Sequence, residues 1–123
     1  MKLRLRGDSL RLRLTQSEVA AVGAGGEVRE RTPFGSGQAL EYRLRADAAA
    51  TEVAADFRDN RISVTLPAEL AAGWANGAEV TIAAGQAVAG ADTLRILVEK
   101  DFACLSERPG EDDSDAFPHP DAG

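Results

Sequence analysis

Leucines alternate with charged residues at the start of the chain. Residues 2–6 read KLRLR and residues 10–14 read LRLRL, with Gly7-Asp8-Ser9 between them. A period of two over four to eight residues is typical of half-buried β-strands, because successive side chains point to opposite faces. Glycine and aspartate at the break are common turn residues. The pattern predicts a hairpin with leucines on one face and charges on the other.

A short helix and two further strands are predicted next. Residues 15–18 read TQSE, which has the S/T-x-x-E form of a capping box. Val19 and Val22 then lie three residues apart on one helical face, and the glycine-rich stretch from position 23 ends the helix. We expect a strand over residues 27–31, a loop over 32–37 and an alternating strand over 40–45.

The second half of the chain repeats this order of elements. Apolar residues alternate over 53–57 and again over 62–66, on either side of Asp59-Asn60, which predicts a second hairpin. Pro67 favours the first turn of a second helix, because the N–H that proline lacks is not needed there. Trp74 is expected in the core beside Leu70. The helix should end at residues 76–77, and the last strands are expected at 79–83 and 93–99.

An internal repeat underlies this order. Residues 14–28, LTQSEVAAVGAGGEV, align without a gap with residues 66–80, LPAELAAGWANGAEV. The alternative is two unrelated helices that both end in glycine turns. The identical positions are Leu14/Leu66, Ala20/Ala72, Gly25/Gly77, Glu27/Glu79 and Val28/Val80.

These patterns predict an α+β, mainly antiparallel fold with about eight strands and two short helices. We expect one β-rich domain over residues 1–105, with repeat cores at 9–31 and 61–83, and an acidic, irregular tail over 106–123. A duplicated β–α–β unit is compatible with a pseudo-symmetric barrel. The hydrophobic share of 44% supplies a core, although aromatic residues make up only 5%.

The second repeat resembles the swapped-hairpin DNA-binding modules of the AbrB and MazE type. The segment RISVTLPAELAAGWANGAEVTI, residues 61–82, carries this resemblance. In those modules two chains intertwine into one barrel, which implies that two copies in one chain make the equivalent barrel. The basic residues that contact DNA in that family have no match here between Pro67 and Gly77. The resemblance therefore implies an architecture and no site.

A second resemblance spans nearly the whole length. The segments RLRLTQSEV, TPFG, ILVEKDFACL and EDDSDAFPHP resemble a small family of uncharacterised bacterial proteins. This resemblance implies no activity. The N-terminus lacks the apolar stretch of a signal peptide, and no apolar run is long enough to span a bilayer. With a single cysteine, the chain is expected in the cytoplasm.

Charge is distributed unevenly along the chain. Residues 1–45 contain nine Lys or Arg and five Asp or Glu, a net charge of +4, whereas residues 46–123 have a net charge of −10. Arginines that alternate with apolar residues would project from one face if their strands share a sheet. Such a face could bind carboxylate or phosphate, although it could equally be an ordinary solvated face. These arginines are Arg4, Arg6, Arg11, Arg13, Arg43 and Arg45.

The acidic tail offers a partner for this face. We expect Asp112, Asp113 and Asp115 to dock onto the arginines of the same chain. The net charge of −6 argues against nucleic acid as the partner, and the arginine strands lack the interleaved aromatic residues that stack on bases.

The residue types that support catalysis or metal binding are sparse. Cys104 and His119 supply two of the four ligands that a structural zinc site needs, and Cys104 has apolar neighbours typical of a buried thiol. No nucleophile or phosphate-binding motif is present, so no catalytic residue, metal or cofactor is predicted.

Three functional classes remain open from the sequence. The preferred class is a non-enzymatic binding module for an anionic ligand or acidic segment. The others are a small enzyme that uses Arg with Asp or Glu in a cleft between the repeats, and an adaptor whose acidic tail recruits a basic partner. The oligomeric state is unknown.

Overall fold

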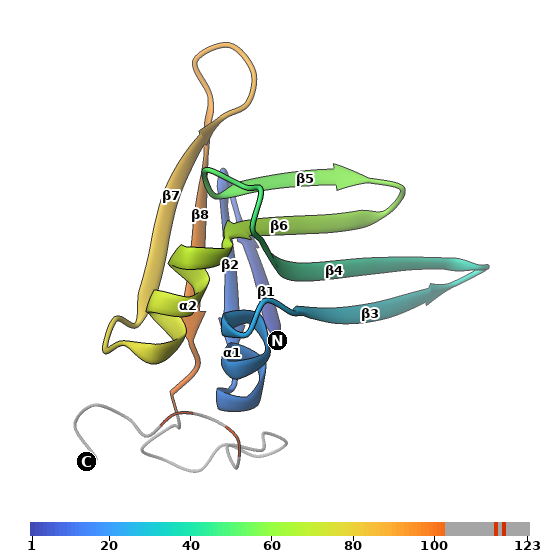
Figure 1. Ribbon diagram of the computed structural model, residues 1–123. Helices are drawn as coiled ribbons and strands as arrows, with labels where there is room; N and C mark the ends of the chain where they lie inside the picture. Colours follow the sequence, from blue (N-terminus) through green and yellow to red (C-terminus); the bar gives the residue numbers. More distant parts are fainter. Residues whose placement is uncertain (103–114, 116, 118–123) are drawn as a thin grey trace.

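The computed structural model describes residues 1–102, 115 and 117. Within these residues the chain forms eight strands and two helices (Figure 1). Their bounds in chain order are β1 (Lys2–Arg6), β2 (Ser9–Leu14), α1 (Gln16–Gly23), β3 (Glu27–Gly35), β4 (Gln38–Asp47), β5 (Ala54–Arg58), β6 (Arg61–Pro67), α2 (Ala68–Asn76), β7 (Thr81–Ala87) and β8 (Thr93–Lys100).

The strands form two four-stranded sheets whose strands cross at a steep angle (Figure 1). Sheet A has the order β1-β2-β8-β7, and sheet B has the order β3-β4-β6-β5. In each sheet the two central strands are parallel and both outer pairs are antiparallel. The predicted α+β, mainly antiparallel class with eight strands and two helices is therefore confirmed.

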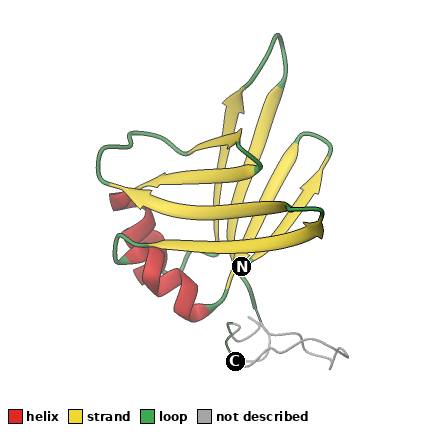
Figure 2. Cartoon of the chain, turned by 90° about the vertical axis from the view of Figure 1, so that its right-hand side faces the viewer, coloured by secondary structure: helices red, strands yellow, loops and turns green. Residues whose placement is uncertain are grey.

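The two halves of the chain have the same order of elements, which supports a true duplication. Each half forms a hairpin, a helix and a second hairpin, and each helix carries the chain from one sheet to the other. Exchanging the halves turns the order β1-β2-β8-β7 into β5-β6-β4-β3, which is sheet B read from its other edge. The fold is thus pseudo-two-fold symmetric, and α1 packs on α2 at one end (Figure 2).

The expected barrel does not form. A barrel closes only when the outermost strands of a sheet also pair. Among the described strands, β1, β7, β3 and β5 each pair on one side only, so both sheets stay open. The barrel expectation was wrong because repetition of a unit does not determine whether the edges of its sheets meet.

Two strand boundaries also differ from the predicted ones. The loop expected over 32–37 is mostly strand, since β3 extends to Gly35 and only Ser36-Gly37 forms the turn. Pro33 is tolerated there because β3 is an edge strand. In the second half β7 begins at Thr81, two residues after Glu79, whereas β3 begins at Glu27. Structurally equivalent residues are therefore 52 positions apart up to the helices and 54 positions apart in the strands that follow them.

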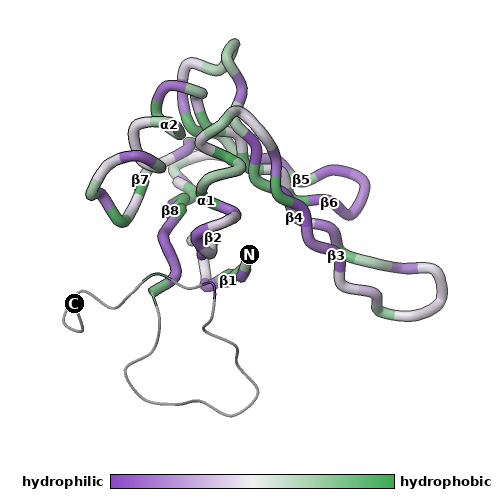
Figure 3. Tube along the Cα trace, turned by 60° about the horizontal axis from the view of Figure 1, so that its bottom comes forward, coloured by the Kyte–Doolittle hydropathy of each residue, from purple (hydrophilic) through white to green (hydrophobic). Residues whose placement is uncertain are grey.

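The predicted hairpin turns are confirmed. Asp59 and Asn60 have positive φ angles of 53° and 60°, as a two-residue type I′ turn requires. Together with their arginine neighbours, they make the tip of the β5–β6 hairpin strongly hydrophilic (Figure 3). Gly7 with Asp8 closes the β1–β2 hairpin in the same two-residue manner.

The core lies between the sheets and the helices. Its leucines occupy the alternate positions predicted for strands, so Leu12 and Leu14 are fully buried while Arg13 is exposed. Trp74 is buried as predicted, and its indole N–H donates to the carbonyl of Val80 at 3.0 Å. Leu70, expected beside it, is 40% exposed. Neither α1 nor α2 is long enough to cross a membrane, and no other helix occurs in the described residues.

A glycine lets the two helices approach closely. Gly23 of α1 faces Ala75 of α2, and a Cβ atom added at Gly23 would lie 2.3 Å from the Cβ of Ala75. The two residues are 52 positions apart, so they are also equivalent positions of the repeat. The pseudo-two-fold axis therefore passes close to a contact in which one partner must be glycine.

The α-amino group of Met1 ties β1 to the rest of the fold. Its nitrogen is buried and lies 2.6 Å from Glu18 Oε2 and 3.1 Å from Glu30 Oε1. Burial alone would lower the pKa of this amine, but hydrogen bonds and charges of the two glutamates outweigh it and raise the pKa above its ordinary value of 8.0. The other oxygen of Glu18 accepts from the Thr15 N–H at 3.0 Å, which completes the predicted capping box.

Exchanging the residues at the helix contact should test its geometry. We expect Gly23→Ala to lower the free energy of unfolding by about 1–3 kcal/mol through overpacking. Adding Ala75→Gly should restore most of the loss, because the same two side chains then exchange places across the axis. Urea denaturation measures both effects. Gly73→Ala is the matched control, since no atom lies within 4 Å of its added Cβ; equal losses at positions 23 and 73 would contradict the contact.

The buried ammonium should make stability depend on pH. Glu18→Gln keeps the capping box but removes the nearer of the two negative charges that face the Met1 ammonium, and should lower the free energy of unfolding by about 1.5–3 kcal/mol at pH 7. Because the folded-state pKa of the amine exceeds 8.0, this contribution is present below pH 8 and is lost as pH rises through the folded-state pKa. Urea denaturation should therefore show a smaller difference in the free energy of unfolding between the wild type and Glu18→Gln at pH 10 than at pH 7. Glu52→Gln, at an exposed position, is the control and should show no such change. A difference that does not change with pH would argue against the ion pair.

Candidate functional site

The six predicted arginines do not share one sheet. Arg4 and Arg6 lie on β1 and Arg11 and Arg13 on β2, all in sheet A. Arg43 and Arg45 lie on β4 in sheet B. The condition for a single arginine face, strands that share a sheet, is not met, because the first hairpin (β1–β2) enters sheet A and the second (β3–β4) enters sheet B. Each group of arginines therefore has its own surroundings.

The arginines of sheet B are held by their neighbours. Arg43 Nε donates to Ser63 Oγ at 2.8 Å, and Arg45 Nε donates to Thr65 Oγ1 at 3.2 Å. A guanidinium nitrogen of Arg43 also lies 3.7 Å from Glu27. Both arginines are half-buried, so they connect β4 to β6 along the outer side of the sheet.

Opposite charges alternate on the remaining outer side of sheet B. Arg29 donates to Glu27, and this hydrogen bond holds the pKa of the Glu27 carboxyl below its usual range. Arg61 Nε lies 2.8 Å from Glu41 Oε1, although its N–H direction is not aligned for a hydrogen bond. The charges of this face are thus largely compensated within the sheet.

The outer face of sheet A carries an excess of positive charge. Glu99 is its central carboxylate: Oε1 lies 3.2 Å from Arg11 Nε and 3.3 Å from Arg13 Nε, and Oε2 accepts from Thr81 Oγ1 at 3.2 Å. At the end of the sheet, Lys2 Nζ lies 3.2 Å from Asp101. The strand alternation places further cations on this face. Its full set of cations is Lys2, Arg4, Arg6, Arg11, Arg13 and Arg95.

Four residues of the first hairpin enclose a small hollow on this face. Arg4, Arg6, Ser9 and Arg11 line a volume of about 100 Å³, which we call the arginine hollow. The strand register explains the grouping, because Arg4 is paired with Arg11 and Arg6 with Ser9. Among the described residues, no carboxylate lies within ion-pair distance of Arg4 or Arg6. Two of the three arginines of the hollow therefore lack a carboxylate partner in the described residues, and one hydroxyl lies beside them.

The structure places Asp115 at α1 and not on the arginines. The Asp115 carboxylate accepts hydrogen bonds from the hydroxyl and the N–H of Ser17, and its carbonyl accepts from the Gln16 N–H at 2.9 Å. Hydrogen bonds from the side chains of Ser17, the largest cause, and Thr15, together with the Ser17 N–H, lower the pKa of the Asp115 carboxyl. The predicted docking residues Asp112 and Asp113 lie outside the described residues.

Phe117 fixes the same part of the tail. Its N–H donates to the carbonyl of Asp101 at 2.7 Å, and its ring centroid lies 5.7 Å from that of Phe102. The ammonium of Lys100 lies 5.7 Å from the Phe117 ring and 5.9 Å from the Trp74 ring. Aromatic contacts and backbone hydrogen bonds thus hold residues 115 and 117 against the helices.

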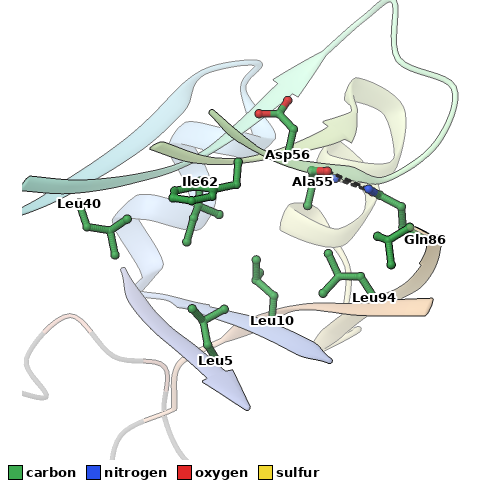
Figure 4. Close-up of a pocket in the computed structure, with 10 residues that line it drawn as sticks. Leu5, Leu10, Leu40, Ala55, Asp56, Ile62, Gln86 and Leu94 are labelled. Atoms are coloured by element: carbon green, nitrogen blue, oxygen red, sulfur yellow. Dashed lines mark hydrogen bonds between the residues drawn. The ribbon is translucent and has the colours of Figure 1, made fainter. Parts of the chain in front are cut away.

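An apolar cleft opens between the two sheets, with a volume of about 550 Å³ (Figure 4). The predicted strand alternation puts Leu5, Leu10 and Ile62 on the apolar sides of their strands, but it does not reveal that this part of the space between the sheets is left uncovered. Asp56 is the one charged residue among those that line it. The lining residues are Leu5, Leu10, Leu40, Ala55, Asp56, Phe57, Ile62, Gln86, Val88 and Leu94.

The described residues contain no cluster of three or more His, Cys, Asp or Glu that could hold a metal ion. Cys104 and His119, the two soft ligands considered from the sequence, lie outside the described residues.

Family comparison gives the chain an identity without an activity. A family model for proteins of unknown function, DUF7009, matches residues 1–121. The chain belongs to this family. The match confirms the resemblance to an uncharacterised family found from the sequence. A search of curated proteins found no match to this DUF7009 chain, and neither did a search of solved structures. Its function must therefore be inferred from its own side chains.

Removing the Asp115 carboxylate should lower the melting temperature. We expect Asp115→Ala and Ser17→Ala to lower it by similar amounts, and the double variant to add little, because both remove the same hydrogen bonds. Since the folded-state pKa of Asp115 is depressed below 3.8, its contribution is present above that pH and is lost as pH falls through the folded-state pKa. Thermal unfolding between pH 2 and pH 7 measures this. Fully additive single effects would show that the two residues act separately.

Proposed function

We propose that this DUF7009 protein is a non-enzymatic binding module that holds an oxyanion group in the arginine hollow. One observation carries the proposal: Arg4 and Arg6 have no carboxylate partner among the described residues, although they lie beside Arg11 and Ser9. The other four predicted arginines contact an acidic or hydroxyl side chain. An anionic ligand would supply the negative charge that Arg4 and Arg6 lack among their described neighbours.

The chemistry of the hollow suits a carboxylate, sulfate or phosphate group. A guanidinium presents its N–H groups as a planar fork that matches two oxygens of such a group. The Ser9 hydroxyl donates to the Arg6 carbonyl at 2.8 Å, which fixes its position at the edge of the hollow. Because Arg4 and Arg6 are exposed, their attraction for an anion should weaken strongly with added salt.

The surroundings favour binding over catalysis. Proton transfer needs a carboxylate, histidine or similar group within reach of the ligand. In the described part of the chain the hollow is lined by three arginines and one serine, and Glu99 is already paired with Arg11 and Arg13. The enzyme alternative placed Arg with Asp or Glu between the repeats, where the lining residues are mostly apolar.

The net charge guides the choice of partner. A chain with a charge of −6 is repelled by nucleic acid at long range, so a small anion or an acidic protein segment is the better ligand class. We also propose a bacterial, cytoplasmic setting, which rests on the family resemblance and on the single cysteine. The adaptor alternative needs a tail that is free to recruit a partner, whereas Asp115 is engaged with α1.

Titration with inorganic phosphate tests the proposal. Backbone NMR signals of residues 4–11 should shift saturably, and the shifts should weaken as sodium chloride is raised. We expect Arg4→Ala and Arg6→Ala each to weaken binding about tenfold, because each removes charged hydrogen bonds.

Arg31→Ala on sheet B is the matched control, because it removes an exposed arginine from the outer side of another edge strand. It should leave binding unchanged. If Arg31→Ala weakened phosphate binding as much as Arg4→Ala, the interaction would be non-specific and the proposal wrong.

A further inference from the structure

The apolar cleft lies on the pseudo-two-fold axis. Leu5 and Phe57 are 52 positions apart, as are Leu10 and Ile62, so each pair occupies equivalent positions of the repeat. These residues lie at the ends of β1 and β5 and at the starts of β2 and β6. Because the helices follow the opposite ends of β2 and β6, they fill the other end of the space between the sheets. Nothing among the described residues fills the end at the cleft.

The walls of the cleft offer no free hydrogen-bonding side chain. The side-chain oxygen of Gln86 accepts from the Ala55 N–H at 2.7 Å, and its nitrogen donates to the Ala55 carbonyl at 2.8 Å. The Asp56 carboxylate points away from the cleft, because Ala55 and Phe57 take the inward positions on β5 (Figure 4). Water inside the cleft would therefore lack protein partners, which favours an apolar occupant.

Three of the six large apolar residues that are exposed in the described part of the chain lie together at the mouth of this cleft. Leu5 is 58% exposed, Phe57 67% and Val88 54%, whereas Leu10 and Ile62 at the floor are buried. Leaving several large apolar side chains together in water is unfavourable, and such patches usually mark interaction sites. A ligand that buries these three side chains would remove the unfavourable exposure of their apolar surface to water.

The volume and lining of the cleft select the class of ligand. A volume of about 550 Å³ lies within the range of small-molecule sites. Five of its lining side chains are Leu or Ile and one is Val, with a single aromatic ring, so they suit a flexible aliphatic chain. Because the walls have no free polar group, any polar end of the ligand must remain at the mouth. The occupant is therefore amphiphilic.

Charge at the mouth selects the head group. The two exposed residues Leu5 and Phe57 are flanked in their strands by Arg4 and Arg6 and by Asp56 and Arg58. These four side chains point to the outer faces of two edge strands, so three cations and one anion lie along the outer side of the mouth. This excess of positive charge favours a negatively charged head that stays outside the cleft.

We propose that the cleft binds the alkyl chain of a single-chain anionic amphiphile such as a fatty carboxylate. The choice of head group rests on the same arginines as the proposed function, whereas the binding of the chain rests on the cleft alone. The chain lies between the sheets against Leu10 and Ile62, and the carboxylate remains outside near Arg4 and Arg6.

Binding of decanoate to the full chain tests the cleft. Calorimetry below the micellar range should give saturable binding of one decanoate per chain, and the methyl NMR signals of Leu10 and Ile62 should shift. Phe57→Ser should weaken binding at least tenfold, because it removes a large apolar contact. Phe34→Ser is the matched control, since Phe34 is 70% exposed but does not line the cleft. Absence of saturable binding, or equal weakening by both variants, would overturn the proposal.

Comparison with decanol tests the head group. Decanoate should bind more tightly than decanol, and Arg6→Ala should weaken decanoate about tenfold while leaving decanol unchanged. Equal affinities for acid and alcohol, unaffected by Arg6→Ala, would overturn the anionic head. The two proposals can be told apart experimentally. If phosphate does not bind, the arginine hollow is not an anion site. If decanoate still binds in a way that depends on Phe57, the cleft remains a binding site.

Discussion

The parallel pairing of β2 with β8 and of β4 with β6 is the constraint on which the rest of the fold depends. These pairings join the first half of the chain to the second, with Leu12 opposite Val98 in sheet A and Leu44 opposite Val64 in sheet B. Neither half supplies a complete sheet, because each contributes two hairpins that enter different sheets. The contacts that complete both sheets therefore span much of the sequence, and such long-range pairing is expected to slow folding.

The sequence predicts the local elements well because their causes are local. Alternating leucines, the capping box at Thr15 and the turn at Asp59-Asn60 depend on nearest neighbours, and each is found where the pattern indicates. The slip of two residues after the helices is not visible in the repeat, because the identity of Glu27 with Glu79 conceals where each strand begins. The alternation of apolar and polar residues likewise does not indicate which strands far apart in the chain pair with each other.

For the candidate sites too, the local sequence predicts which face of a strand a side chain occupies, but not which residues of other strands lie beside it. Arg4 and Arg43 have the same alternating context, yet Arg43 contacts Ser63 and Arg4 has no acidic partner among the described residues. That difference depends on which strand lies alongside, which the sequence does not specify. Leu5 and Phe57 were correctly assigned to the inward face, but alternation cannot tell whether an inward face is covered by the opposite sheet. The cleft could therefore be recognised only once the two sheets were placed.

Covalent joining of the two repeats has a consequence for how they can diverge. In a symmetric dimer every substitution appears twice, so both sides of a cleft on the axis must remain identical. Here Arg4 and Asp56 occupy equivalent positions with opposite charge, and Val22 and Trp74 differ as widely in size. The two rims have thus become distinguishable while the apolar floor has kept its symmetry. An asymmetric ligand can enter the cleft in two opposite orientations. In a symmetric dimer these orientations have equal energy, whereas the single chain with unequal rims can bind one of them more tightly.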